Sequence, residues 1–193
     1  MALAYTNQTI ELREISLKNR PNSLYEISPK GTVPVLFINN NRILDESLDI
    51  MLWSLNNSDT NDWYVKNKNI QLEIIKRNDT GFKLWLNKYK YFVRYPDFDQ
   101  DYYRKKCNEF LYDIEVHLEK YQYILSNQVS LVDIAIFPLV RQFANVDFKY
   151  FNAKYAKLTN WFNKINNSNL FVSIMKKYPE FDEKSRLIVN FNE

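Results

Sequence analysis

Glu46 and Ser47 are the adjacent residues best suited to hold a charged small molecule. They stand at the start of a predicted helix, where a serine offers its hydroxyl and N–H to an anion and the helix dipole favours negative charge. The neighbouring carboxylate can hold an ammonium group. An amino-acid head group carries both charges, so the pair predicts a site for such a group. The alternative interpretation is that Asp45, Glu46 and Ser47 only cap the helix.

The preceding stretch Lys30–Leu36 reads Lys-Gly-Thr-Val-Pro-Val-Leu and is suited to an extended ligand. Pro34 stands where a strand should begin, a position that tolerates proline and where an X-Pro bond can be cis. Val33 would then turn its backbone N–H and C=O outward, free to pair with a peptide-like ligand by strand addition. Because this loop comes shortly before Glu46 and Ser47, we favour ligand binding over simple capping.

Three segments together resemble the cytosolic glutathione S-transferase superfamily, in particular its bacterial glutathione transferase-like members: Ser28–Leu36, Asp45–Ile50 and Ser130–Pro138. Their order and spacing match the family, and the resemblance runs from Met1 to about Pro179. It implies an α+β fold, in which an incomplete thioredoxin-like N-terminal domain is followed by an all-α helical bundle domain.

Hydrophobic patterning places the elements of the first domain, which we expect to span residues 1–56. Alternating apolar residues predict strands, asparagines that tolerate positive φ predict a hairpin turn, and an apolar stripe predicts a helix. The strands are expected at 10–16, 35–38 and 43–44, the turn at Asn39–Asn41 and the helix from Glu46 to about Leu55.

Residues 57–66 are expected to form a linker and the start of the helical region, and residues 67–193 the all-α domain. Helices are predicted at about 67–92 with an interruption near 78–81, at 99–123, from Ser130, at 153–166 and at 169–177. Ser130 and Asp133 form a capping box at the start of the most apolar of these helices, which we expect to lie at the centre of the bundle.

The resemblance assigns roles to the candidate site residues. In the family, the Glu46–Ser47 pair binds the γ-glutamyl end of glutathione, and Val33 before a cis Pro34 pairs with the cysteinyl backbone. Lys30 and Thr32 are placed to meet the glycine carboxylate, although such a lysine is more often simply solvated. Trp85 and Tyr89 are candidates for the wall of an apolar substrate pocket, whereas aromatic residues at helical spacing more often belong to a core.

Composition excludes several classes of function. Lys+Arg 26 against Asp+Glu 23 leaves a net charge of +3, and the basic residues are scattered, so we expect no nucleic-acid partner. No stretch approaches the roughly 20 apolar residues of a spanning helix, so we expect no membrane partner and a cytoplasmic protein. The single cysteine, Cys107, cannot form an internal disulfide, and no residue pattern suggests a metal site.

The start of the chain departs from the family pattern. A thioredoxin-like domain begins with a strand and a turn that bears the catalytic Cys, Ser or Tyr, whereas Met1 falls inside the helix that follows them. The catalytic residue therefore cannot be named. We expect the natural protein to carry an additional strand and turn upstream of Met1.

The resemblance implies a glutathione-dependent reaction. Either the glutathione thiolate attacks an electrophilic small molecule, as in detoxification, or glutathione takes part in thiol–disulfide exchange with a disulfide substrate. Glutathione would be the co-substrate, and the protein would form a homodimer. The alternative is a non-catalytic module, in which the same fold serves to bind a protein partner.

Overall fold

The computed structural model describes residues 1–39 and 42–191. Its internal contacts divide the chain into two compact units, one of Met1–Asn61 with Asn169–Glu193 and one of Asp62–Ser168. The division at Asn61 falls inside the linker expected at 57–66. The tail differs from the expectation of a single helical domain over 67–193, because the residues from Asn169 onward belong to the first unit.

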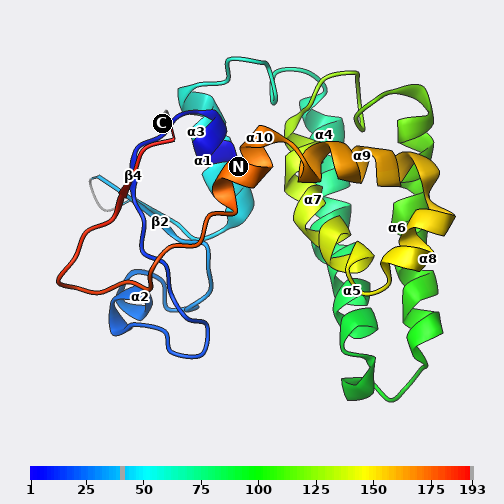
Figure 1. Ribbon diagram of the computed structural model, residues 1–193, viewed down its shortest axis with the longest axis horizontal. Coiled ribbons are helices and arrows are strands. Elements are labelled where there is room, and N and C mark those ends of the chain that lie inside the picture. Colours follow the sequence, from blue (N-terminus) through cyan, green and yellow to red (C-terminus); the bar gives the residue numbers. More distant parts are fainter. Residues whose placement is uncertain (40–41, 192–193) are drawn as a thin grey trace. The chain divides into compact units, whose positions relative to one another are not determined.

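The first unit combines short helices with two small sheets (Figure 1). Its helices are α1 (Ala2–Tyr5), α2 (Asn22–Ile27), α3 (Ser47–Asn57) and α10 (Asn169–Ile174). Its strands are β1 (Ile10–Glu11), β2 (Leu36–Ile38), β3 (Arg42–Leu44) and β4 (Ile188–Val189). The strand expected at 10–16 is thus limited to its first two residues.

Strands β2 and β3 form the expected antiparallel hairpin, with Leu36 opposite Leu44 and Phe37 opposite Ile43. Of its predicted turn, Asn40 and Asn41 lie outside the described residues. The hairpin leads directly into α3, whose inner face buries Ile50, Ser54 and Leu55. This arrangement fixes the first turn of α3 next to the end of a strand.

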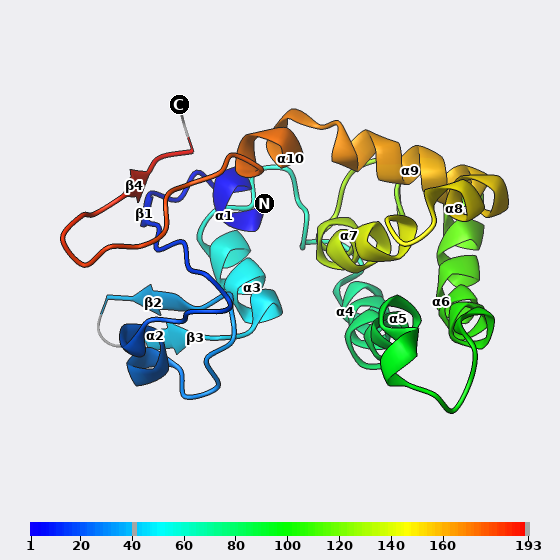
Figure 2. The ribbon, with the colours of Figure 1, turned by 60° about the horizontal axis from the view of Figure 1, so that its bottom comes forward.

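Strand β4 pairs with β1 in an antiparallel ladder, with Ile10 opposite Val189 (Figure 2). Two further backbone hydrogen bonds extend the pairing, from Leu12 N to Leu187 O at 2.8 Å and from Phe181 N to Glu14 O at 2.6 Å. These bonds satisfy backbone groups of the segment that follows β1, and together with the β1–β4 ladder they explain why the tail belongs to the first unit.

The second unit is entirely helical in its regular structure. Its elements are α4 (Lys68–Arg77), a π-helical turn (Asn78–Phe82), α5 (Lys83–Lys90), a 3-10 turn (Phe92–Arg94), α6 (Gln100–Lys120), α7 (Leu131–Ala144), α8 (Phe148–Lys154) and α9 (Ala156–Asn166). The expected interruption near 78–81 is the π-helical turn. The helix expected at 153–166 is instead two helices that meet at Tyr155.

Helix α7 is the centre of this unit and contacts α4, α5 and α9 (Figure 1). Its side chains Leu131, Val132, Ile136, Phe137 and Val140 have no exposed surface. Burial of such apolar side chains contributes about 1.5–3 kcal/mol each. No helix among the described residues is long and apolar enough to span a membrane.

The buried carboxylate of Asp133 holds the start of α7. Its Oδ2 accepts hydrogen bonds from Ser130 N at 2.9 Å and Ser130 Oγ at 2.7 Å. The bond from Ser130 N is one half of the capping box expected from the sequence, and the Ser130 side chain completes the box by accepting from the Asp133 N–H. Its Oδ1 accepts bonds from Ile124 N at 3.0 Å and Trp161 Nε1 at 2.8 Å. Burial raises the pKa of this carboxyl, whereas the hydrogen bonds from these donors act in the opposite direction.

We predict that Asp133→Ala lowers the free energy of unfolding by at least about 3 kcal/mol, because it leaves four buried donors without an acceptor. Urea unfolding followed by circular dichroism measures the change. The matched control is Asp113→Ala, since Asp113 forms an ion pair with Arg77 in which both side chains are about half exposed. Its effect should stay within about 1 kcal/mol. Equal effects of the two substitutions would contradict the structural role of Asp133.

The two glycines of the chain predict opposite effects of the same substitution. Gly31 has φ of 61°, and a Cβ there would lie 2.3 Å from Tyr25 Cε1, whereas a Cβ at Gly81 would meet no atom within 4 Å. Gly31→Ala should lower the free energy of unfolding by about 1–2 kcal/mol, and Gly81→Ala should raise it by about 0.5–1 kcal/mol. Urea unfolding of both variants tests the pair, and stabilisation by Gly31→Ala would be inconsistent with this turn.

Candidate functional site

The loop before β2 presents its backbone to solvent. The Val33–Pro34 bond is cis, as the sequence allowed, and Val33 is 47% exposed. Within the described part of the chain, the Val33 N–H and C=O make no hydrogen bond. Thr32 and Pro34 are also exposed. The loop is therefore open to a ligand that offers a complementary donor and acceptor.

Gly31 fixes the shape of this loop. Its N–H donates to Ser28 O at 2.9 Å, and its positive φ makes a turn between Ser28 and Thr32. Ser28 is buried, and its hydroxyl donates to Asp45 Oδ2 at 3.2 Å. This bond ties the loop to the residues just before α3.

Helix α3 begins at Ser47, with Glu46 in an extended conformation at its N-cap position. The Glu46 side chain makes no capping hydrogen bond to the helix. Ser47 is exposed in the first turn of α3. There its N–H and hydroxyl can donate hydrogen bonds to an anion, which the helix dipole also favours. The carboxylate of Glu46 is therefore available for another role than capping.

That carboxylate binds the ammonium of Lys30. Lys30 Nζ lies 2.8 Å from Glu46 Oε1 and 3.2 Å from Asp45 Oδ2. The hydrogen bonds to Glu46 and then to Asp45 raise the pKa of Lys30, and the bond from Lys30 lowers the pKa of Asp45. All three side chains are partly exposed, so the cluster stays accessible from solvent.

Of the predicted glutathione-binding residues, the structure brings Lys30 into contact with Glu46, next to Ser47. Thr32, Val33 and Pro34 follow Lys30 on the same loop. Sequence reasoning treated Asp45 only as a capping residue and missed its contact with Lys30. The sequence feature that could have predicted this contact is the spacing of opposite charges. A lysine beside the loop and two acids before α3 come together because the β2–β3 hairpin reverses the chain between them.

The two predicted substrate-pocket residues lie in the second unit and differ in accessibility. Tyr89 is only 2% exposed and packs on Phe143 with ring centroids 5.2 Å apart, so it belongs to the core. Burial raises the pKa of its hydroxyl. Trp85 is half-buried and stacks on Tyr103 with centroids 6.4 Å apart. Only Trp85 keeps a surface that a small molecule could reach.

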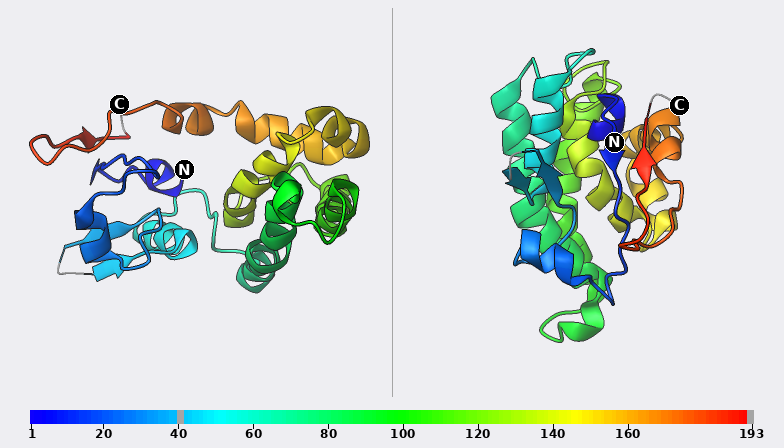
Figure 3. Two further views of the ribbon diagram at one scale, coloured as in Figure 1. Left: turned by 90° about the horizontal axis from the view of Figure 1, so that it is seen from below. Right: turned by 90° about the vertical axis from the view of Figure 1, so that its left-hand side faces the viewer.

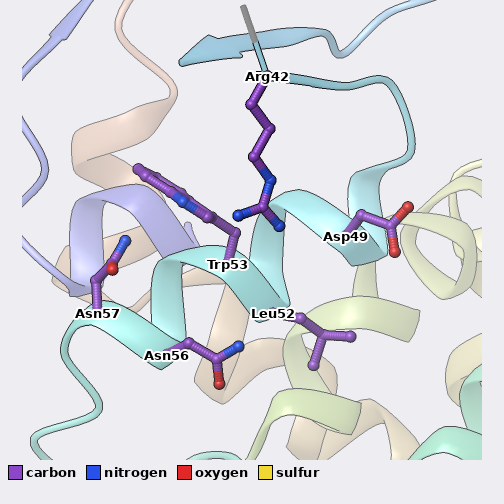
Figure 4. Close-up of a pocket in the computed structure, with 6 residues that line it drawn as sticks. All are labelled: Arg42, Asp49, Leu52, Trp53, Asn56 and Asn57. Atoms are coloured by element: carbon purple, nitrogen blue, oxygen red, sulfur yellow. The ribbon is translucent and has the colours of Figure 1, made fainter. Parts of the chain in front are cut away.

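A hollow of about 300 Å³ lies along α3, a feature that the sequence did not indicate (Figure 4). The Arg42 side chain extends from β3 towards α3 and lies beside Trp53. The other lining residues repeat at helical spacing along α3: Asp49, Leu52, Asn56 and Asn57. Among the described residues, no group of three or more acidic, histidine or cysteine side chains is placed to hold a metal ion.

Family models and solved structures identify relatives of this chain. The glutathione S-transferase N-terminal domain model matches residues 1–61, and the glutathione S-transferase C-terminal domain model matches residues 82–169. A comparison with curated protein sequences found no match.

Three solved structures illustrate the likeness. A bacterial glutathione S-transferase, BphK, in a ternary complex is 18% identical, with 89% of this chain and 88% of that chain covered and a TM-score of 0.75. The glutathione transferase URE2P6 from Phanerochaete chrysosporium with oxidized glutathione is 16% identical, with 90% of this chain and 86% of that chain covered and a TM-score of 0.77. Glutathione S-transferase-I with lactoylglutathione is 15% identical, with 90% of this chain and 89% of that chain covered and a TM-score of 0.72.

The TM-scores of 0.75, 0.77 and 0.72 show a shared fold, in which a small thioredoxin-like domain is joined to a helical domain. The two family models match the same two regions in the same order. The chain therefore belongs to the glutathione S-transferase family.

Proposed function

We propose that the protein binds glutathione at the loop 30–34 and the first turn of α3, and that it uses the glutathione thiol in a transfer reaction. The observation that carries this proposal is the Lys30 ammonium held by Glu46 and Asp45. The carboxylates of Glu46 and Asp45 thus already bind an ammonium group, the one that Lys30 carries. The ammonium of a γ-glutamyl head group has the same chemistry.

The neighbouring groups suit the rest of the ligand. The γ-glutamyl carboxylate would accept from the N–H and hydroxyl of Ser47, where the helix dipole favours an anion. The cysteinyl backbone would pair with the free N–H and C=O of Val33 beside Pro34, as an added strand does. Lys30, released by the incoming ammonium, would then be free with Thr32 to meet the glycine carboxylate.

In this proposal the bound thiol reacts as a thiolate, since the thiolate is the nucleophile. Its sulfur forms a bond to an electrophilic carbon and displaces the leaving group, or attacks one sulfur of a disulfide and releases the other as a thiolate. Trp85 stays the candidate for the wall of an apolar substrate pocket. The oxidized glutathione and the lactoylglutathione in two of the solved structures support the choice of ligand. We further propose a cytoplasmic homodimer.

We predict that Glu46→Gln weakens glutathione binding about tenfold, because a charge-assisted hydrogen bond to the ligand ammonium is lost. Ser47→Ala should weaken it by several-fold through the ligand carboxylate. Isothermal titration of glutathione into each variant measures these changes. The matched control is Glu26→Gln, which removes another exposed acid of the same unit and should leave the affinity unchanged.

A second ligand tests whether Glu46 meets the ammonium itself. N-acetylglutathione lacks that charge, so it should bind wild type and Glu46→Gln with nearly equal affinity. If Glu46→Gln weakens both ligands alike, the assignment of Glu46 to the ammonium is wrong. If glutathione binds but no electrophile or disulfide is turned over, the non-catalytic interaction module replaces the transferase proposal.

A further inference from the structure

The turn between α5 and α6 exposes a group of apolar side chains that the proposed glutathione site does not use. Residues 91–98, here called the α5–α6 tip, form one end of the helical unit and project beyond its neighbouring helices (Figure 3). Val93 is 81% exposed and Phe98 is 51% exposed. Tyr91 and Phe92 are about two-fifths exposed. Four large apolar side chains are thus exposed within eight residues of the chain, and exposed apolar groups gathered in this way are typical of interaction sites.

The tip is held in shape from inside. Tyr103 Oη donates to Tyr95 O at 3.0 Å, and Asn87 Nδ2 donates to Tyr95 Oη at 2.8 Å. The ring of Phe98 stacks on Tyr102 with centroids 4.0 Å apart. The exposed side chains are thus presented on a braced turn, and binding through them requires little further ordering.

The helix that enters the tip is basic. Over residues 83–95 the sequence has Lys83, Lys88, Lys90 and Arg94 and no acidic residue. The Lys90 ammonium and the Arg94 guanidinium each lie 5.0 Å from the centre of the Tyr91 ring. Positive charge is therefore gathered at the base of the apolar group.

One acid, Asp97, lies within the tip, and two more, Asp99 and Asp101, follow it. Asp99 caps α6 by accepting from Tyr102 N at 2.7 Å, and Asp101 pairs with Arg104 and Lys105. Asp97 alone has no resolved partner among the described residues. Over residues 88–105 the sequence has five basic residues, including Arg104 and Lys105, against these three acids, so the local net charge is +2.

We propose that the α5–α6 tip binds the surface of a membrane that contains anionic lipids. The tip projects beyond its neighbouring helices (Figure 3), so its exposed side chains can enter a soft apolar layer. Phe92 and Val93 would enter the boundary between head groups and acyl chains, and Tyr91 would lie at the head-group level, where aromatic rings are favoured. Lys90 and Arg94 would meet the lipid phosphates and carboxylates. Binding of this kind at the membrane surface needs no spanning helix.

The test is co-sedimentation of the full chain with vesicles of phosphatidylcholine that contain 30% phosphatidylserine, in parallel with vesicles of phosphatidylcholine alone. We expect retention on the anionic vesicles only, and weaker retention as salt is raised. Val93→Glu should reduce binding at least about tenfold, and Arg94→Gln about fivefold. The matched control is Val116→Glu on α6, a valine of the same unit that is 55% exposed, which should bind as wild type does.

Two outcomes would overturn the proposal. One is that wild type is not retained on the anionic vesicles, and the other is that Val93→Glu and Val116→Glu bind alike. Analytical ultracentrifugation of the same variants tests a second copy as the occupant, since loss of a dimer on Val93→Glu alone would make the tip a self-association surface instead. Circular dichroism of each variant shows whether the fold is retained. The experiment needs no glutathione, so its result is independent of the proposed function.

Discussion

The helical unit depends on one buried hydrogen-bond acceptor, the carboxylate of Asp133. A wholly buried carboxylate is costly unless its oxygens are fully hydrogen-bonded. Here the donors come from three parts of the chain: the start of α7, the preceding loop at Ile124 and helix α9 at Trp161. The same group that starts the central helix therefore also fixes the loop before it and the helix packed beside it. Local capping and tertiary packing share one side chain.

The glutathione-binding region proposed here has the opposite character, because its charges are exposed and exchangeable. Lys30 and Glu46 are each more than half exposed, and ion pairs of that kind contribute little to stability. A ligand ammonium can thus replace the Lys30 ammonium without disturbing the hairpin or α3. The rigid part of the site is instead the turn at Gly31 and the buried hydroxyl of Ser28. Stability and recognition are assigned to different residues of the same loop.

The sequence was informative where neighbours along the chain determine the structure. The capping box of Ser130 and Asp133, the β2–β3 hairpin and the start of α3 near Glu46 all follow from local spacing. The pairing of Ile10 with Val189 could not be predicted, because two-residue strands at opposite ends of the chain carry no pattern of their own. The contacts of Asp133 with Ile124 and Trp161, and of Lys30 with Asp45, likewise depend on tertiary packing.

A buried amide shows why the segment after the division at Asn61 is more than a spacer. Gln71 is 1% exposed, and its Nε2 donates to Trp63 O at 3.1 Å and to Lys66 O at 2.8 Å. Its Oε1 accepts from Val132 N at 3.0 Å, while Leu131 N donates to Trp63 O at 2.9 Å. The first N–H groups of α7, which no helical carbonyl can satisfy, are thus bonded by α4 and by residues 62–67, here called the entry segment. The central helix of the bundle is therefore capped by its own box at Asp133 and by residues some sixty positions earlier in the chain, so the entry segment folds as part of the helical unit.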